Sequence, residues 1–181
     1  MKVLALTLIS SLALGGCGLE QSVRDNMTEG RYQDVAGRFL ELKQPLPVEV
    51  DRARVFIQDG EVRGAGAINQ YRTQCNLELD QVALKAEEIE PDTFRIVRVQ
   101  RAIEQVVLTR PVQVASLQLA GRFDGGSSAF FEGYHFWLSS GRQGDVRRLS
   151  CYGTYAEPAD LRPPTLQEIR QTLGDIAEIR R

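Results

Sequence analysis

The sequence predicts a mainly β (α+β) protein, in which an antiparallel sheet, sandwich or half-barrel carries one amphipathic helix at its C-terminal end. Three observations predict this class. Between residues 52 and 155, short runs rich in Val, Ile, Phe and Tyr are separated by clusters of Gly, Pro, Asp and Ser. An Asp-Gly pair joins two of these runs, which is the strongest short hairpin signal. Over residues 165–179, apolar residues recur instead at helical spacing.

Residues 17–47 show no β alternation, and we expect them to form a tether that precedes a single domain of residues 48–181. One short amphipathic helix can form over residues 35–42 within this tether. Pro45 and Pro47 end any such helix and favour extended backbone before the first strand.

The first strand is expected over residues 52–58, with a return run over residues 61–79. Both central positions of a type I′ turn need positive φ, which Asp59 and Gly60 tolerate. Residues 82–89 are ambiguous between helix and strand. Further strands are expected over residues 92–99, 102–108, 112–123, 130–138 and 146–155, of which the last two form a hairpin.

The C-terminal helix has a distinct start. Thr165 and Glu168 match the capping box, in which each side chain bonds the backbone N–H of the other residue. Leu166, Ile169 and Leu173 then form an apolar stripe that can pack on the sheet. Gly174 weakens this helix by about 1 kcal/mol relative to Ala.

The N-terminal residues have the order of a secretory signal, with Lys2 followed by an apolar run over residues 3–14 and two glycines. This run is shorter than the roughly 20 residues that a membrane helix needs. Leu14-Gly15-Gly16-Cys17 resembles the lipobox of bacterial lipoproteins, a resemblance that covers residues 1–17 only. The resemblance implies that residues 1–16 are removed and that Cys17 receives a diacylglycerol and a further acyl chain such as palmitate.

By the same resemblance, Gly18 in place of Asp after the cysteine implies export to the periplasmic face of the outer membrane, with the inner membrane less favoured. Each buried methylene contributes roughly 0.8 kcal/mol, and a single acyl chain binds only reversibly. Three chains on Cys17 would therefore hold the protein in the lipid bilayer permanently.

Two further cysteines, Cys75 and Cys151, are expected to pair as a structural disulfide in an exported chain. Closing a loop of this length stabilises a fold by roughly 4 to 5 kcal/mol on the chain-entropy model. Metal binding is the rival interpretation, but two thiols and the single His135 do not complete a tetrahedral zinc site without carboxylates. We expect neither a metal nor a cofactor.

Residues 17–181 carry 24 acidic and 21 basic side chains, since Lys2 is the one charged residue before them. This near-neutral balance argues against nucleic acid as a partner. The basic residues are almost all arginine, with Lys43 and Lys85 as the exceptions. Arginine binds carboxylates and phosphates bidentately, but a GC-rich genome produces the same composition, and from the sequence alone we favour that explanation.

No catalytic motif is found. His135 is the one histidine, and no serine near it in sequence lies in a nucleophile-elbow pattern. Acidic residues gather between Glu87 and Asp92, but their spacing does not single out a pair. We therefore expect a protein that is not an enzyme.

The most aromatic stretch of the chain lies over residues 130–138. Strand alternation places Phe131, His135 and Trp137 on one face and Tyr134 and Phe136 on the other. If the second face is the core, the first three residues form a candidate partner-binding surface. A strand buried on both faces explains the same pattern equally well.

The sequence thus predicts a lipid-anchored envelope protein that binds an unknown protein or cell-wall component. Two alternatives stay open. One is an envelope hydrolase acting on glycan or lipid through His135 or the acids between Glu87 and Asp92. The other is a carrier that holds an apolar ligand inside a curved sheet.

Overall fold

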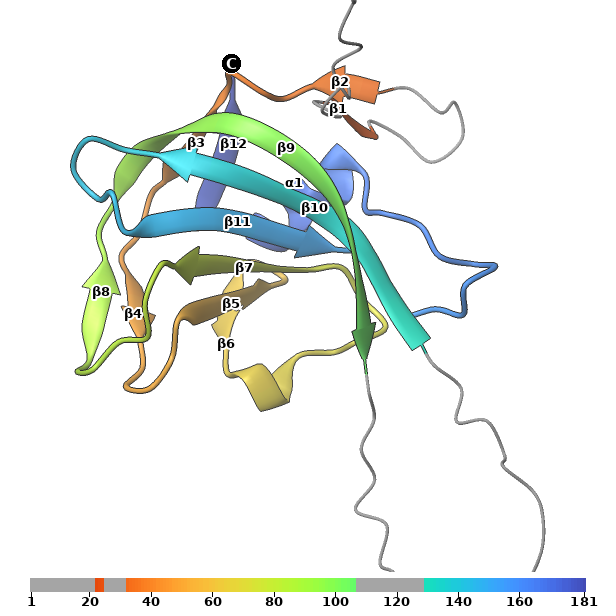
Figure 1. Cartoon of the computed structure of the whole chain (residues 1–181), viewed down its shortest axis with the longest axis horizontal. Helices are drawn as coiled ribbons and strands as arrows, with labels where there is room; N and C mark the ends of the chain where they lie inside the picture. The colour runs from red at the N-terminus through yellow and green to blue at the C-terminus, as the bar shows by residue number, and fades with distance from the viewer. Residues whose placement is uncertain (1–21, 25–31, 107–128) are drawn as a thin grey trace, which may run out of the picture.

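The computed structural model describes residues 22–24, 32–106 and 129–181. Within these ranges the chain is mostly β, and the predicted mainly β class with one helix near the C-terminus is confirmed (Figure 1). Of the three arrangements that the sequence left open, the structure has the curled antiparallel half-barrel. The strands of the main sheet are β3 (Phe39–Leu42), β5 (Arg54–Gln58), β6 (Glu61–Arg63), β7 (Gln74–Leu79), β9 (Asp92–Val106), β10 (Ala129–Ser139), β11 (Val146–Tyr152) and β12 (Ala177–Arg180). Their order in the sheet is β12–β3–β9–β10–β11–β7–β5–β6, and every neighbouring pair is antiparallel.

Smaller elements lie around this sheet. Strand β1 (Ser22–Arg24) pairs with β2 (Tyr32–Asp34), and β4 (Leu46–Val48) pairs with β8 (Glu87–Ile89), in two separate two-stranded sheets. A 3₁₀ turn covers Ala65–Ala67, and the helix α1 covers Leu166–Leu173.

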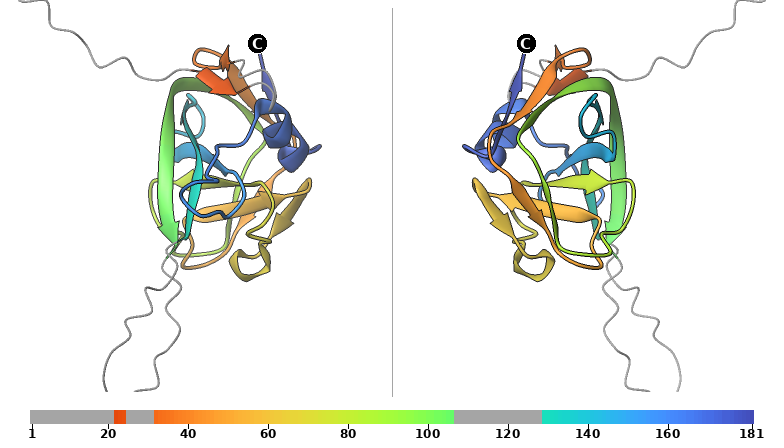
Figure 2. Two further views of the ribbon diagram at one scale, coloured as in Figure 1. Left: turned by 90° about the vertical axis from the view of Figure 1, so that its right-hand side faces the viewer. Right: turned by 90° about the vertical axis from the view of Figure 1, so that its left-hand side faces the viewer.

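Helix α1 closes the open side of the curled sheet. It packs against β5 and β7 near one end of the strand order and against β12 at the other end. Both views of Figure 2 accordingly show the helix on the side of the molecule opposite β9. Leu166, Ile169 and Leu173 of α1 are fully buried in the interior. The apolar stripe of the helix thus completes the core that the sheet alone would leave open to water.

The strand register sets the composition of the core. Phe136, Leu149, Leu77 and Val55 lie opposite one another on β10, β11, β7 and β5, and all four are buried. On each of these strands, the residues directly before and after the buried one point to the outward face of the sheet, because successive side chains of a strand alternate between its two faces.

The predicted disulfide between Cys75 and Cys151 is present. The two cysteines are direct register partners on β7 and β11 and are fully buried, next to Tyr134 in the neighbouring position on β10. The bond therefore joins adjacent strands of the sheet and lies inside the core.

Two predictions from short sequence motifs, the Asp-Gly turn and the capping box, are confirmed by the backbone angles and hydrogen bonds of the structure. Asp59 and Gly60 both have positive φ, of 56° and 73°, and they connect β5 to β6. In the capping box, the Glu168 N–H donates to Thr165 Oγ1 at 3.1 Å and the Thr165 N–H donates to Glu168 Oε2 at 2.7 Å.

The possible short helix over residues 35–42 is not formed, and the boundary drawn at residue 48 is too late. Residues 39–42 form β3, which lies in the main sheet between β12 and β9. Leu40 and Leu42 are buried while Phe39 is exposed, so this segment has the two-residue period of a strand. Gly37, with a φ of 85°, makes the turn that leads into it.

The C-terminal helix is shorter than the predicted 165–179, because it ends at Leu173. Gly174 has a φ of 53°, and a Cβ atom at this position would lie 2.6 Å from the Cα atom of Gly60. A residue without a side chain fits this close approach, and its positive φ turns the chain back. Ala177–Arg180 then form β12, which pairs with β3. Burial of Ile176 and Ile179 thus continues the apolar pattern after the helix has ended.

The strands between residues 82 and 106 differ from the expectation in two places. Residues 92–106 form one strand of 15 residues, β9, in place of two. In the ambiguous segment of residues 82–89, only Glu87–Ile89 form a strand. The strand expected over residues 112–123 lies outside the described residues, as does Cys17.

Replacing both Cys75 and Cys151 with alanine should lower the free energy of unfolding by about 4 to 5 kcal/mol, because the bond closes a loop with a sequence separation of 76 residues. Urea denaturation of the full chain carrying Cys17→Ser, with and without the two substitutions, measures this change. Reduction of the unsubstituted chain should shift the midpoint by a similar amount and should leave the double variant unchanged. An equal effect of reductant on both proteins would contradict the prediction.

Candidate functional site

The outward face of the sheet brings the predicted partner-binding residues into very different surroundings. Phe131 and His135 are each only 7% exposed, whereas Trp137 is half-buried. The Phe131 ring lies 5.7 Å from the ring of Tyr155, and the ring of Tyr152 lies edge-on to His135 at 6.0 Å. Of the three residues, Trp137 is therefore the one whose side chain reaches the surface to a substantial extent.

Trp137 is surrounded by three guanidinium groups. The Cζ atom of Arg98 lies 4.3 Å from the centroid of the Trp137 ring, and those of Arg147 and Arg148 each lie 5.3 Å from it. The register explains this arrangement, since Trp137 on β10 faces Arg98 on β9 and Arg148 on β11. Attraction between a cation and the face of an indole ring contributes about 0.5 to 1 kcal/mol at exposed sites. The Trp137 indole N–H also donates to Gln100 Oε1 at 3.3 Å, which fixes the plane of the ring.

A buried carboxylate, that of Glu78, pairs with two of these arginines, Arg147 and Arg148, and with Arg54. Glu78 on β7 is 7% exposed, and its Oε2 atom lies 3.0 Å from Arg148 Nη2 and 3.4 Å from Arg54 Nε. Arg147 Nη1 lies 3.9 Å from Glu78 Oε1, and its Nε lies 3.7 Å from Asp80 Oδ1. The carboxylates of Glu78 and Asp80 therefore pair with three guanidinium groups.

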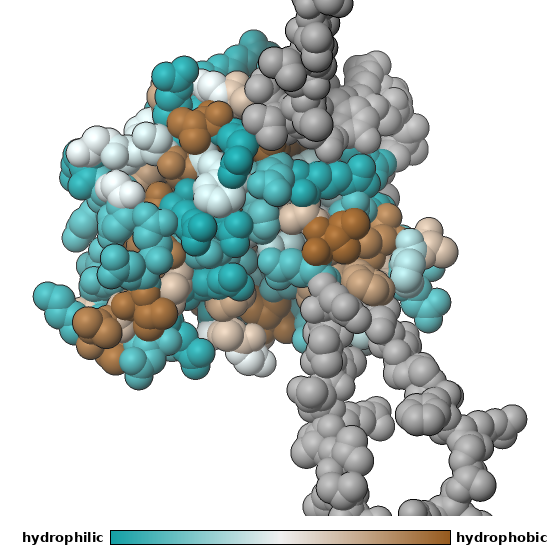
Figure 3. Space-filling view, in the orientation of Figure 1, coloured by the Kyte–Doolittle hydropathy of each residue, from teal (hydrophilic) through white to brown (hydrophobic). Residues whose placement is uncertain are grey.

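We define the Trp137 face by the residues that meet on this part of the sheet: Arg54, Glu78, Asp80, Arg98, Trp137, Arg147 and Arg148. It holds four arginines and two acids, and Arg98 forms an ion pair with no carboxylate of the described residues. Figure 3 views the molecule from the side on which β7, β9, β10 and β11 lie in Figure 1, and the centre of this view is hydrophilic. The Trp137 face is thus a positively charged area with ordered planar donors.

A buried polar row lies next to the Trp137 face. His135 Nδ1 and Ser150 Oγ are 2.8 Å apart, and Ser150 faces Asn76 on β7. Asn76 is 3% exposed, and its Oδ1 atom accepts no hydrogen bond from the part of the chain that the structure describes. A buried acceptor without a hydrogen bond lowers the stability of a fold. Asn76 is therefore an unfavourable contribution to the stability of this part of the sheet.

His135 and Ser150 do not form an accessible catalytic pair. Ser150 is 1% exposed, so a reacting molecule does not reach its hydroxyl group in this conformation. Burial, reinforced by the charge of Arg148, lowers the pKa of His135 from 6.5 to about 4. The imidazole is therefore neutral at pH 7 and packs within the sheet.

The acids between Glu87 and Asp92 are not brought to His135. Glu87 and Glu88 are exposed on β8, which belongs to a separate two-stranded sheet. Asp92 accepts a hydrogen bond of 2.6 Å from Ser140 Oγ. Burial raises the pKa of Asp92, but the hydrogen bonds from Ser140, the Thr93 N–H and Gln143 outweigh it and hold the pKa below its usual range. Asp92 thus serves as the acceptor that orders the β10–β11 turn.

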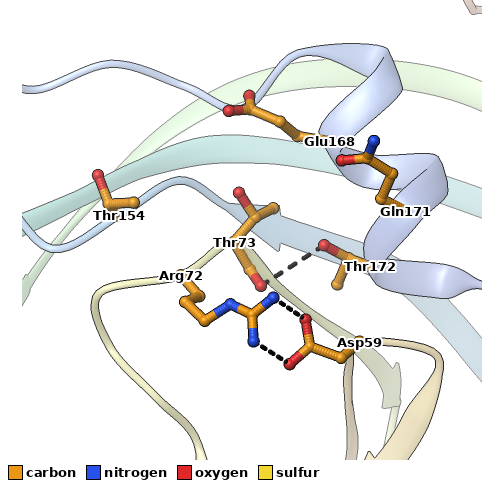
Figure 4. A pocket seen from close by; sticks show the side chains of 7 residues that line it. All are labelled: Asp59, Arg72, Thr73, Thr154, Glu168, Gln171 and Thr172. Atoms are coloured by element: carbon orange, nitrogen blue, oxygen red, sulfur yellow. Dashed lines mark hydrogen bonds and ion pairs between the residues drawn. The ribbon is translucent and has the colours of Figure 1, made fainter.

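A polar cavity of about 250 Å³, which no sequence pattern indicates, lies between α1 and the start of β7 (Figure 4). Its charged groups are engaged with one another. Arg72 binds both oxygens of Asp59, at 2.7 Å each, and Glu168 accepts hydrogen bonds in the capping box. Burial raises the pKa of Glu168, but bonds from Thr165 and Arg162 hold it below the usual value. These groups stabilise the helix and the turn between β5 and β6.

Other kinds of site are not found in the described ranges. There, no three His, Cys, Asp or Glu side chains gather as metal ligands. In the same ranges, no helix has the length and the apolar character that crossing a membrane requires. No family model, curated protein or solved structure matches the chain.

The aromatic stretch of the sequence indicates Trp137 as a candidate surface residue, but no sequence pattern indicates the arginines around it. Arg98, Arg147 and Arg148 are separated by up to 50 positions along the chain and follow no motif. The arginine-rich composition is the one sequence feature that relates to this cluster, and it does not say which arginines lie together. The pairing of β10 with β9 and β11 is what brings these three to Trp137.

The stability of the fold should fall between pH 6.5 and about 4, because His135 stays neutral in the folded state over this range while the unfolded chain binds a proton. Lowering the pH from 7 to 4.5 should cost about 2 to 3 kcal/mol from this residue alone. Urea midpoints at the two pH values, measured for the parent chain and for His135→Gln, give the contribution as a difference. Identical losses in the two proteins would show that His135 does not cause the pH dependence.

Proposed function

We propose that this chain is an exported lipoprotein, anchored through Cys17 at the periplasmic face of the outer membrane, that binds a cell-wall component on its Trp137 face. The lipobox resemblance of residues 1–17 supports the anchor, and the buried Cys75–Cys151 disulfide fits an oxidising compartment. The proposed role is that of a binding module and involves no catalytic step.

The observation that carries the proposed binding role is the excess of arginines around Trp137. Of the four guanidinium groups, those of Arg54, Arg147 and Arg148 pair with the two carboxylates. Three of the four, including that of Arg98, lie within 5.3 Å of the centroid of the indole ring. Ordering these side chains before binding reduces the entropy that a ligand must otherwise overcome. The face is therefore prepared to bind an anion.

The ligand class that fits best is a carboxylate on a peptide or glycan of the cell wall. Glu78 already shows how the site holds such a group, since Arg148 contacts it through both Nε and Nη2. A planar guanidinium forms paired bonds with a carboxylate. Arg98 and Arg147, beside Trp137, are the residues proposed to receive the ligand carboxylate.

The two alternative functions gain less support from these contacts. A hydrolase based on His135 would need access to Ser150, which is 1% exposed. A carrier would need room inside the half-barrel, where the apolar side chains of α1 are fully buried.

Cys17→Ser should abolish labelling by radioactive palmitate and release the protein from membranes, because the thiol is the proposed site of acylation. Labelling of cells that express either form, followed by membrane fractionation, measures both effects. Arg63→Gln, a substitution at an exposed arginine that leaves every cysteine in place, is the control and should keep the label. Persistent labelling of Cys17→Ser would remove the anchor from the proposal.

Arg98→Gln and Arg147→Gln should each weaken binding to purified cell-wall sacculi by about five-fold, as expected for an exposed contact of about 1 kcal/mol. Trp137→Ala should weaken binding although it changes no charge, and Trp137→Phe should restore part of it because the ring returns. Co-sedimentation of the full chain carrying Cys17→Ser, at two salt concentrations, gives the affinities.

Arg63→Gln serves as the control, since Arg63 is an exposed arginine that pairs with Glu61 on β6. A loss of binding in this control equal to that in Arg98→Gln would reduce the effect to total charge. Binding to vesicles of anionic phospholipid but not to sacculi would place the ligand in the membrane and overturn the cell-wall proposal.

A further inference from the structure

A second surface lies beside the Trp137 face, at the loops that follow β4 and β7. Three exposed aliphatic residues occupy these loops: Val50 is 49% exposed, Val82 52% and Leu84 89%. Figure 3 shows hydrophobic side chains at the lower left, where Figure 1 places the two loops. Aliphatic groups that gather at one exposed place typically mark a contact surface.

The two loops hold each other in place. The Asp51 N–H donates to the Ala83 carbonyl at 2.8 Å, and the Ala83 N–H donates to the Arg52 carbonyl at 2.8 Å. Ala83 itself is buried, at 3% exposure, between the exposed Val82 and Leu84. The backbone of the loop is therefore fixed, and Val82 and Leu84 are presented outward from a defined position.

Hollows adjoin these aliphatic residues. One cavity of about 720 Å³ is lined by Leu79, Val82, Ala83 and Leu84 together with polar neighbours. A second, of about 410 Å³, lies against β4 and is lined by Pro47 and Val48, and Glu87 lines both. The surface thus combines projecting aliphatic groups with space for the side chains of a partner.

The charge around the two cavities is strongly negative. One cation, Lys85, lines them, against five carboxylates: Glu49, Asp80, Glu87, Glu88 and Asp145. Within the described residues, Asp80 is the one of these five that forms a salt bridge, at 3.7 Å to Arg147. We call this surface the acidic tip, defined by Val50, Val82, Leu84 and the five carboxylates.

We propose that the acidic tip docks a segment of a partner protein that presents an aliphatic side chain flanked by lysine or arginine. The aliphatic side chain would enter the 720 Å³ cavity beside Leu84, and the basic residues would face Glu87 and its neighbours. Complementary charge of this kind selects a partner and speeds association. This surface adjoins the Trp137 face at Asp80, which belongs to both, and the Trp137 face has the opposite charge.

Charge complementarity also disfavours the other occupants. An anionic bilayer surface would repel five carboxylates. In a symmetric dimer through this tip, the same acids would face their own copies across the interface, because a two-fold contact uses one patch twice. A basic and aliphatic segment satisfies both the apolar groups and the carboxylates.

The test uses two synthetic amphipathic peptides of equal length, one of leucine and lysine and the other of leucine and glutamate. The full chain carrying Cys17→Ser should bind the lysine peptide in fluorescence anisotropy, more weakly as salt rises, and should not bind the glutamate peptide. A photoreactive group on the lysine peptide should crosslink to residues 49–52 or 80–88. Leu84→Ser should weaken binding about ten-fold, as expected for an anchor residue of an interface.

Charge reversal gives the sharper readout. Replacing Glu49, Glu87 and Glu88 together with lysine changes five carboxylates and one lysine into two carboxylates and four lysines. This variant should bind the lysine peptide more weakly and should gain binding of the glutamate peptide, a change that loss of folding would not produce. The matched controls are Ile103→Ser, which removes an aliphatic side chain that is 62% exposed on β9, and Glu157→Lys, which reverses an exposed acid after β11. Both controls should bind like the parent chain.

Four results would overturn the proposal: equal binding of the two peptides, crosslinks outside these loops, a concentration-dependent dimer that Leu84→Ser abolishes, or vesicle binding that Leu84→Ser abolishes. The last two would assign the tip to a second copy or to a lipid surface. None of these outcomes bears on the Trp137 face, whose tests use different residues and a different probe.

Discussion

The structure depends on one constraint, which is that the inner face of the curled sheet must be covered. Eight strands bend into a half-barrel, and the gap between β12 and the β5–β7 side is filled by α1. The short helix covers the part of the core that the sheet leaves open, since its apolar residues Leu166, Ile169 and Leu173 have no exposed surface. Removal of apolar area from water is the main favourable term in folding. The Thr165 cap, the turn at Gly60 and the close approach at Gly174 all serve to place this helix.

The same constraint determines the outward face. Once Tyr134 and Phe136 point into the core, His135 and Trp137 must point outward, because a strand alternates its side chains. Pairing of β10 with β9 and β11 then brings Arg98 and Arg148 to either side of Trp137. A shift of one residue in register would exchange the two faces and dismantle both the core and the arginine cluster. The proposed binding site is thus a direct consequence of how the core is packed.

The near-neutral charge of the chain hides a separation of charge over its surface. Arginines exceed acids around Trp137, while five carboxylates and one lysine line the cavities of the acidic tip. The ion pair between Arg147 and Asp80 lies where the two areas meet. Opposite fields on one domain allow it to contact two different partners at once, with each field attracting what the other repels. A protein held at a membrane by its N-terminus and binding the cell wall on one face would have the acidic tip available for a protein.

The sequence by itself determined the features that depend on neighbouring residues. The turn at Asp59-Gly60, the capping box of Thr165 and Glu168, and the strands that alternate around Tyr134 follow from local backbone and side-chain preferences. Pairing of Cys75 with Cys151 also followed, since few cysteines leave few choices. Only the tertiary structure decided that residues 39–42 and 177–180 are strands, because each is stable through its partner across the sheet. It also decided that Phe131 and His135 are buried and that distant arginines surround Trp137, since register between strands is set by long-range packing that no local pattern encodes.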